Sequence, residues 1–179
     1  MPNVVVWGHT FIPYRSHEAI QADVQRVAQQ IQHDLEGVQL PLFLCMLNGA
    51  FVFAADLLRA YCGPVEVEFV RYSSYSGLGS SGHTQELLGL RKPIAGRHVV
   101  VVEDIVDTGL TMAQLLVRLR EAGAASVRIA TMFFKPEAFK EHFQLDYVGQ
   151  SIDNKFVIGY GLDYDGLGRN LPGLYILQQ

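Results

Sequence analysis

The sequence predicts an α/β fold, in which helices flank a mainly parallel, twisted β-sheet. Stretches typical of strands and of helices alternate along the chain, which is the order that builds parallel sheets. The strand-like runs 40–47 and 98–102 are almost wholly apolar, as strands covered on both faces are. Ligands of such folds bind at the carboxyl ends of the strands, so we expect a site in the loops that follow these runs.

The first half of the chain begins with a long amphipathic helix. Ser16 is a suitable N-cap, apolar residues recur every three or four positions to about Glu36, and Gly37 provides the stop. The elements expected after it are a strand at Leu40–Leu47, a helix at Ala50–Ala60 and an alternating strand at Val65–Tyr72. The following stretch, Ser73–Gly96, is rich in serine and glycine, and we interpret its first part as a mobile loop.

The second half continues the same alternation. We expect a strand at His98–Val102, a helix at Thr111–Ala122, a strand at Ser126–Phe134 and shorter strands at Lys155–Tyr160 and Leu174–Leu177. No internal repeat and no linker-like segment divides the chain. A single domain spanning residues 1–179 follows from this pattern.

Composition narrows the class of function. Hydrophobic residues make up 49% of the chain and charged residues 18%, which is typical of a globular protein. A formal charge of −4 does not indicate a nucleic-acid-binding protein, which would usually be basic. No apolar stretch is long enough to cross a membrane. Cys45 and Cys62 lie in unrelated contexts without metal-ligand spacing. We expect a cytoplasmic protein that binds neither nucleic acid nor membrane.

The most informative segment follows the apolar run at 98–102. Glu103 and Asp104 are adjacent carboxylates, Asp107 is a third, and a Thr-Gly-x-Thr sequence from Thr108 to Thr111 then opens a helix. The unpaired N–H groups of a helix start suit a phosphate. Adjacent carboxylates suit a sugar's hydroxyl groups or a magnesium ion held through water. The alternative is strand-end acids with one residue capping the helix, but a cap needs one acceptor and not three.

This segment, VVVVEDIVDTGLT, resembles the signature of the type I phosphoribosyltransferases. Its particular residues resemble those of the hypoxanthine-guanine branch. The resemblance extends from about Pro41 to the C-terminus. It implies one phosphoribosyltransferase domain with a small hood formed by the terminal segments. It also implies Mg²⁺ as cofactor and two substrates, 5-phosphoribosyl-1-pyrophosphate and a 6-oxopurine base. We expect a homodimer or homotetramer on the same ground.

The resemblance also implies roles for the residues of the acidic segment. Glu103 and Asp104 would face the ribose hydroxyls and the metal. The 5-phosphate would be bound by Asp107, Thr108, Gly109, Leu110 and Thr111. Asp107 would lie near N7 of the base as the catalytic general base. Leu110 departs from the family, since many members have a lysine there.

The purine pocket is implied by residues farther along the chain. Lys135 would donate to O6 of the base, Phe156 would stack on the purine ring, and the backbone of Val157 would bond the base edge. Asp163 corresponds to the acid for a second metal and lies near the exocyclic group that distinguishes guanine. From pattern alone, Lys135 is a solvated strand end and Phe156 a core residue.

Two further loops complete the resemblance. Asn48 and Gly49 would bind pyrophosphate together with Arg169, and the peptide bond before Asn48 would be cis. Asn48 stands where lysine or arginine is common, which leaves a backbone contact. The dipeptide Ser74-Tyr75 would open a flexible lid at about 73–91.

Of three alternative interpretations of the sequence, one is rejected and two stay open. The run Gly77–Gly82 spells GxGxxG, but no buried strand precedes it and no amphipathic helix follows it, so we reject a dinucleotide site. A transferase for xanthine or a pyrimidine would share the phosphate chemistry. A regulatory protein could use the same fold only to sense a phosphoribosyl ligand or to bind RNA.

Overall fold

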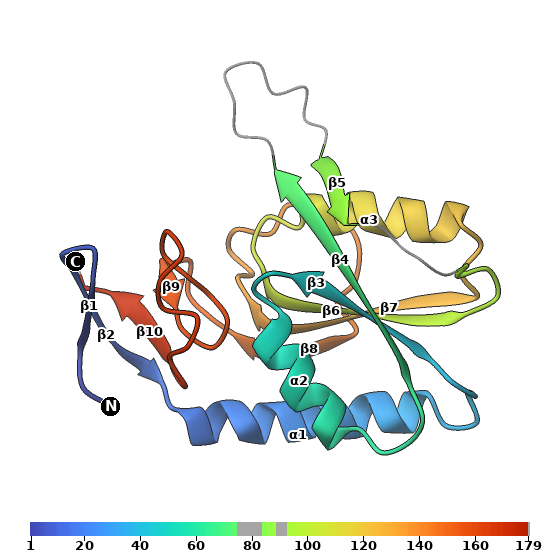
Figure 1. The fold of residues 1–179 in the computed structure, drawn as a ribbon, viewed down its shortest axis with the longest axis horizontal. Helices are drawn as coiled ribbons and strands as arrows, with labels where there is room; N and C mark the ends of the chain where they lie inside the picture. The colour runs from blue at the N-terminus through green and yellow to red at the C-terminus, as the bar shows by residue number, and fades with distance from the viewer. Residues whose placement is uncertain (75–83, 89–92, 179) are drawn as a thin grey trace.

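The protein folds into a six-stranded sheet with helices on both faces and a smaller four-stranded sheet at one end (Figure 1). The structure is a computed structural model and describes residues 1–74, 84–88 and 93–178. The large sheet has the order β5-β4-β3-β6-β7-β8. Five of these strands are parallel, and β5 pairs antiparallel to β4. The predicted fold class is confirmed.

The elements of the large sheet follow the predicted alternation. The strands are β3 (Leu42–Leu47), β4 (Glu66–Ser74), β5 (Thr84–Leu88), β6 (His98–Val106), β7 (Ser126–Phe134) and β8 (Tyr147–Ser151). The helices are α1 (His17–Asp34), α2 (Phe51–Ala60) and α3 (Leu110–Glu121). One part of the prediction was wrong, because backbone pairing carries β6 beyond Val102, through Glu103 to Val106. The mobile loop expected in the first part of 73–96 falls mainly on residues 75–83, which lie outside the described residues, and residues 84–88 form β5, which pairs antiparallel with β4.

The hood expected at the chain ends is the small sheet, with the order β1-β2-β10-β9. Its strands are β1 (Val4–Val6), β2 (His9–Arg15), β9 (Val157–Ile158) and β10 (Leu174–Leu177). β10 lies between β2 and β9, so the first and last segments of the chain are joined in one sheet. The strand predicted at Lys155–Tyr160 is reduced to β9, because Gly159 and Tyr160 adopt positive φ angles and turn the chain away.

Two apolar layers hold the large sheet between its helices. Helices α1 and α2 cover one face, where Ile20, Val24 and Ile31 pack on strand residues such as Phe43 and Val100. Helix α3 covers the other face through Leu115 and Leu119 (Figure 1). Because the central strands β3 and β6 are buried on both faces, their polar groups lie at the strand ends. No helix in the described part of the chain is long and apolar enough to cross a membrane.

Replacement of Ser16 by alanine tests the start of α1. The Ser16 side chain accepts a hydrogen bond from the Ala19 N–H at 3.3 Å, which confirms the predicted N-cap. Ser16→Ala should lower the free energy of unfolding by about 1 kcal/mol, the usual cost of losing a capping side chain. Ser16→Asp keeps an acceptor at this position and should retain most of the stability. Urea denaturation measures both, and equal stability of Ser16→Ala and wild type would contradict the role.

Candidate active site

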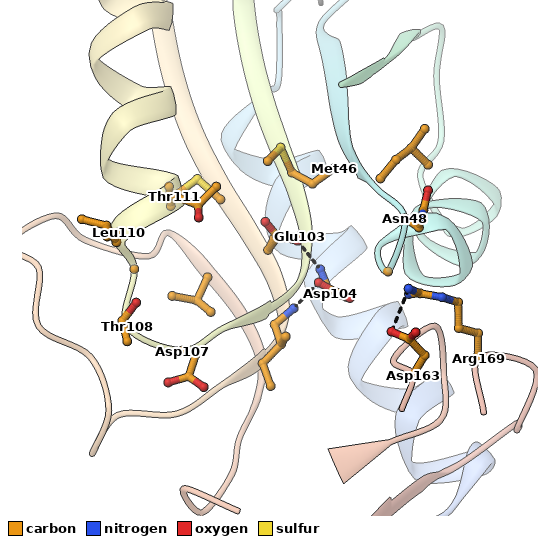
Figure 2. A pocket seen from close by; sticks show the side chains of 16 residues that line it. Met46, Asn48, Glu103, Asp104, Asp107, Thr108, Leu110, Thr111, Asp163 and Arg169 are labelled. Atoms are coloured by element: carbon orange, nitrogen blue, oxygen red, sulfur yellow. Dashed lines mark hydrogen bonds and ion pairs between the residues drawn. The ribbon is translucent and has the colours of Figure 1, made fainter. Parts of the chain in front are cut away.

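A cavity of about 350 Å³ opens at the carboxyl ends of β3 and β6 (Figure 2). Three segments that are distant in sequence line it: residues 46–49 after β3, residues 103–112 at the end of β6 and the start of α3, and the pair Asp163 and Arg169. The pairing of β3 with β6 in parallel brings their ends to one edge of the sheet. The predicted ribose, phosphate and pyrophosphate residues therefore share one cavity.

The adjacent acids Glu103 and Asp104 lie within β6 and are only partly exposed. The Asp104 N–H donates to Oε1 of Glu103 at 3.1 Å, and the Ile105 N–H donates to Oδ1 of Asp104 at 2.8 Å. Burial, and then the neighbouring charge of Asp104, raises the pKa of Glu103 well above its ordinary value. Burial also raises the pKa of Asp104, although its hydrogen bonds and the charge of Arg169 act in the opposite direction. The pair is therefore held at an energetic cost.

The segment from Asp107 to Thr111 forms the turn into α3. Gly109 is the N-cap residue, with φ of 85°, and no side chain caps this helix start. A Cβ at Gly109 would lie 2.6 Å from a ring carbon of Phe139, so this position admits only glycine without rearrangement. Gly109 has no side chain with which to cap the helix, and Asp107, Thr108 and Thr111 lie at the turn that opens it (Figure 2). A helix start of this kind suits an anion.

The loop after β3 approaches the acids with its backbone. The Leu47–Asn48 peptide bond is cis, as the resemblance implied. A Cβ at Gly49 would lie 1.4 Å from Oδ2 of Asp104, so the glycine backbone rests directly on this carboxylate. Helix α2 begins at Phe51, and Ala50 provides no side-chain cap. The loop therefore presents backbone groups to the cavity beside Asp104.

Asp163 and Arg169 face the cavity from the loop that follows β9. Nη2 of Arg169 lies 2.7 Å from Oδ1 of Asp163 (Figure 2). Nη1 of Arg169 donates to the Gly161 carbonyl at 2.7 Å. The other oxygen of Asp163 accepts from the Gly166 N–H at 2.8 Å. These contacts hold the guanidinium of Arg169 at the end of the cavity where Asn48 and Gly49 lie (Figure 2). All three residues were predicted to bind pyrophosphate.

Three of the residues predicted to bind the purine, Lys135, Phe156 and Val157, are not among the residues that line the cavity. Lys135 is buried, with 8% of its surface exposed, and its Nζ lies 3.3 Å from Oδ2 of Asp107. Phe156 is 46% exposed and lines a second, apolar hollow of about 270 Å³ with His9, Phe11, Tyr164 and Leu177. Val157 is buried in β9. The structure thus joins Lys135 to the cavity through Asp107, whereas Phe156 and Val157 do not line it.

The metal and lid assignments have different outcomes. In the described part of the chain, no group of three or more His, Cys, Asp or Glu side chains is arranged to hold a metal ion. The three predicted metal ligands, Glu103, Asp104 and Asp163, are thus not arranged around one point. Asp163 forms an ion pair with Arg169. Ser74 is the last residue of β4, and Tyr75 lies outside the described residues.

Several residues of the cavity were not predicted from the sequence. Met46, Ile105, Val106 and Met112 also line it. They lie at the end of β3, at the end of β6 and in the first turn of α3, so their positions next to predicted residues were the available signal. The aromatic neighbours of Phe156, which come from β2 and from the loop after β9, had no such signal.

Comparison with known proteins agrees with this geometry. Residues 14–165 match the model of the phosphoribosyl transferase domain family. A hypoxanthine-guanine phosphoribosyltransferase of Streptococcus thermophilus is 39% identical over 92% of this chain and 91% of its own length. A hypoxanthine-guanine-xanthine phosphoribosyltransferase of Tritrichomonas foetus is 38% identical over 92% of this chain and 90% of its own.

Solved structures give the same result. The hypoxanthine phosphoribosyl transferase of Trypanosoma cruzi superposes with a TM-score of 0.89 at 37% identity, covering 98% of this chain and 95% of that one. A hypoxanthine-guanine phosphoribosyltransferase of Bacillus anthracis superposes with a TM-score of 0.88 at 34% identity, covering 93% and 98%. The likeness therefore includes both the large sheet and the hood.

Replacement of Glu103 by glutamine tests the cost of the acid pair. Glu103→Gln removes a buried negative charge next to Asp104 and keeps the shape of the side chain. The ligand-free variant should be more stable than wild type at pH 7, by about 1 kcal/mol, the size that single stabilising substitutions reach. The difference should shrink below pH 4, because a carboxyl whose pKa is raised by folding is protonated there in both states. Thermal denaturation across this pH range measures it, and a destabilised variant at pH 7 would contradict the argument.

Proposed function

Because the chain belongs to the phosphoribosyl transferase domain family, we propose that it transfers the 5-phosphoribosyl group of 5-phosphoribosyl-1-pyrophosphate to hypoxanthine and/or guanine, which makes IMP or GMP in purine salvage. The observation that carries the proposal is the single cavity lined by the acid pair, the helix start at Asp107–Thr111 and Arg169. Its parts fit the three parts of one substrate: a sugar, a terminal phosphate and a pyrophosphate.

The phosphoribosyl substrate has a place for each of its groups. The 5-phosphate would accept hydrogen bonds from the N–H groups at the start of α3 and from the hydroxyls of Thr108 and Thr111. The ribose hydroxyls would donate to Glu103 and Asp104. Pyrophosphate would lie between the backbone of the loop at Asn48 and Gly49 and the guanidinium of Arg169.

Magnesium fits the oxygen donors of this cavity. Mg²⁺ keeps several waters and uses one or two protein carboxylates together with substrate phosphates, so a three-ligand protein group is not required. Glu103 and Asp104 would hold it, with Asp163 as the acid for a second ion once the substrate competes for Arg169. Bound magnesium would neutralise the charge of the pyrophosphate leaving group.

The chemistry exchanges one bond at the ribose for another. N9 of the purine attacks C1 of the ribose, the bond from C1 to the pyrophosphate oxygen breaks, and the proton on N7 passes to Asp107. C1 gains positive character as pyrophosphate leaves, and the carboxylates of Glu103 and Asp104 stabilise that charge across the ribose.

The base would be selected by Lys135. In the ligand-free structure its ammonium is paired with Asp107 in a largely buried position. On binding, Lys135 donates to O6 of hypoxanthine or guanine, Phe156 stacks on the ring and the backbone of Val157 bonds its edge. The backbone at Asp163 would lie near the exocyclic group that separates guanine from hypoxanthine. The lid at 73–91 and a homodimer or homotetramer stay predictions.

The activity is tested by offering purified enzyme several bases with 5-phosphoribosyl-1-pyrophosphate and Mg²⁺. Hypoxanthine and/or guanine should be converted, with xanthine included because the Tritrichomonas foetus relative is named for it. Adenine should not be converted, and excess EDTA should abolish turnover. Ultraviolet absorbance follows the reaction. No conversion of any 6-oxopurine, or full turnover in EDTA, would refute the proposal.

Asp107→Asn tests the general base. The amide keeps the size of the side chain but cannot take a proton, so turnover should fall by about 10² or more, while substrate binding stays largely intact. Single-turnover kinetics are required, because product release limits many enzymes. A near-normal rate of the chemical step would remove Asp107 from this role.

Lys135→Ala tests base selection. Adenine carries an amino donor where the preferred bases carry O6, so the buried ammonium would face a donor in place of an acceptor, and such sites discriminate by about 10⁴ or more. The variant should lose catalytic efficiency for hypoxanthine and guanine together, with little change in binding of 5-phosphoribosyl-1-pyrophosphate. Phe156→Ala, as the comparison, should weaken all purines alike. Intact use of hypoxanthine by Lys135→Ala would show that the pocket is misassigned.

A further inference from the structure

Tyr160 connects two parts of the cavity that are more than one hundred residues apart. It is 2% exposed, and its hydroxyl donates to Oδ2 of Asp56 at 2.8 Å. Asp56 lies on α2, the helix that begins directly after the loop at Asn48 and Gly49. Gln21 of α1 donates to the same oxygen at 2.7 Å, and Arg59 is paired with the other oxygen at 3.3 Å. Asp56 is therefore itself held firmly in place.

On the other side, Tyr160 is joined to the segment that carries Arg169. The next residue, Gly161, donates its N–H to the Arg169 carbonyl at 3.0 Å. The Gly161 carbonyl in turn accepts from Nη1 of Arg169 at 2.7 Å. The Tyr160 N–H donates to the Leu171 carbonyl at 2.8 Å. The position of Gly161 thus sets the position of the guanidinium.

Gly161 also touches the loop after β3. A Cβ at Gly161 would lie 2.1 Å from the Gly49 carbonyl oxygen, and a Cβ at Gly49 would lie 1.4 Å from Asp104. Asp104, Gly49 and Gly161 are therefore stacked in direct contact. Tyr160 has φ of 49°, a conformation that a non-glycine residue keeps only when its surroundings hold it there. The Tyr160 side chain is held by burial and by its bond to Asp56, which Gln21 shares.

We propose that Tyr160, anchored by Asp56, is a positioning residue that fixes Arg169 against the Gly49 loop and so forms the pyrophosphate end of the site. This inference rests on the proposed function and adds a residue to it that touches no substrate. The hydroxyl is suited to the task, because burial and the bond to Asp56 raise the pKa of Tyr160 and keep it a donor.

The test compares two tyrosine variants that lose the same kind of bond. Tyr160→Phe removes the hydroxyl next to the site. Tyr147→Phe is the matched control, since Tyr147 is also 2% exposed and its hydroxyl donates to Asp34 of α1 at 3.0 Å, on β8 and away from the cavity. The two variants should show similar falls in melting temperature. If Tyr160 is a positioning residue, only Tyr160→Phe should also weaken ligand binding.

Binding is measured by calorimetry with two probes, magnesium pyrophosphate and IMP. Tyr160→Phe should raise the Kd of magnesium pyrophosphate about fivefold or more, the factor that one hydrogen bond contributes. Its Kd for IMP, which has no pyrophosphate, should change less than about twofold. In steady state the KM for 5-phosphoribosyl-1-pyrophosphate should rise and the KM for hypoxanthine should not. Tyr147→Phe should bind both probes as wild type does.

Three outcomes overturn the inference: unchanged binding of magnesium pyrophosphate by Tyr160→Phe, equal weakening of both probes, or the same selective loss in Tyr147→Phe. Asp56→Ala removes the bond from its other partner and must reproduce the selective loss, which decides the question if Tyr160→Phe does not fold. Wild-type enzyme that binds neither probe and converts no base would instead refute the proposed function. The two failures are thereby separated.

Discussion

The parallel pairing of β6 between β3 and β7 is the constraint on which the site depends. Cys45 of β3 is level with Val102 of β6, and β7 follows β6 in register to Val106. The loops after β3 and β6 must therefore leave the sheet side by side, and Gly49 meets Asp104 for this reason. A slip of one residue in β6 would turn Glu103 and Asp104 to the opposite faces and separate the acids from both phosphate loops.

The same pairing imposes an energetic cost on the two acids. Extension of β6 to Val106 carries Glu103 and Asp104 into a partly buried position, where desolvation disfavours both charged forms and the charge of Asp104 further disfavours that of Glu103. Apolar residues would pack better at this strand end. In the proposed function, Mg²⁺ and the ribose hydroxyls would offset this cost. The acids are therefore explained by function and not by stability.

Sequence alone predicted the elements whose signals are local. Ser16 caps α1 as expected, and the acidic segment with its helix start was identifiable because its residues are adjacent in the chain. The end of β6 was predicted too early, since the carboxylates suggested a loop while cross-strand pairing with Phe133 and Phe134 continues the strand. Strands β1 and β2 form a local hairpin whose signal was missed. Strand β8 was not assigned and the partners of Phe156 were not foreseen, because both depend on contacts with segments distant in the chain.

The charges of the cavity limit how a phosphate-rich substrate can be held. Four carboxylates line the cavity: Glu103, Asp104, Asp107 and Asp163. The two basic side chains nearby are already paired, Arg169 with Asp163 and the buried Lys135 with Asp107. Asn48 and Leu110 line the cavity as uncharged residues, so neither adds a positive charge. Within the described residues, the remaining donors to phosphate are mainly backbone N–H groups at the two helix starts, which carry partial charge only. In the proposed function, the substrate would therefore bind together with Mg²⁺, and the placement of Arg169 would have greater weight than in a site with more basic residues.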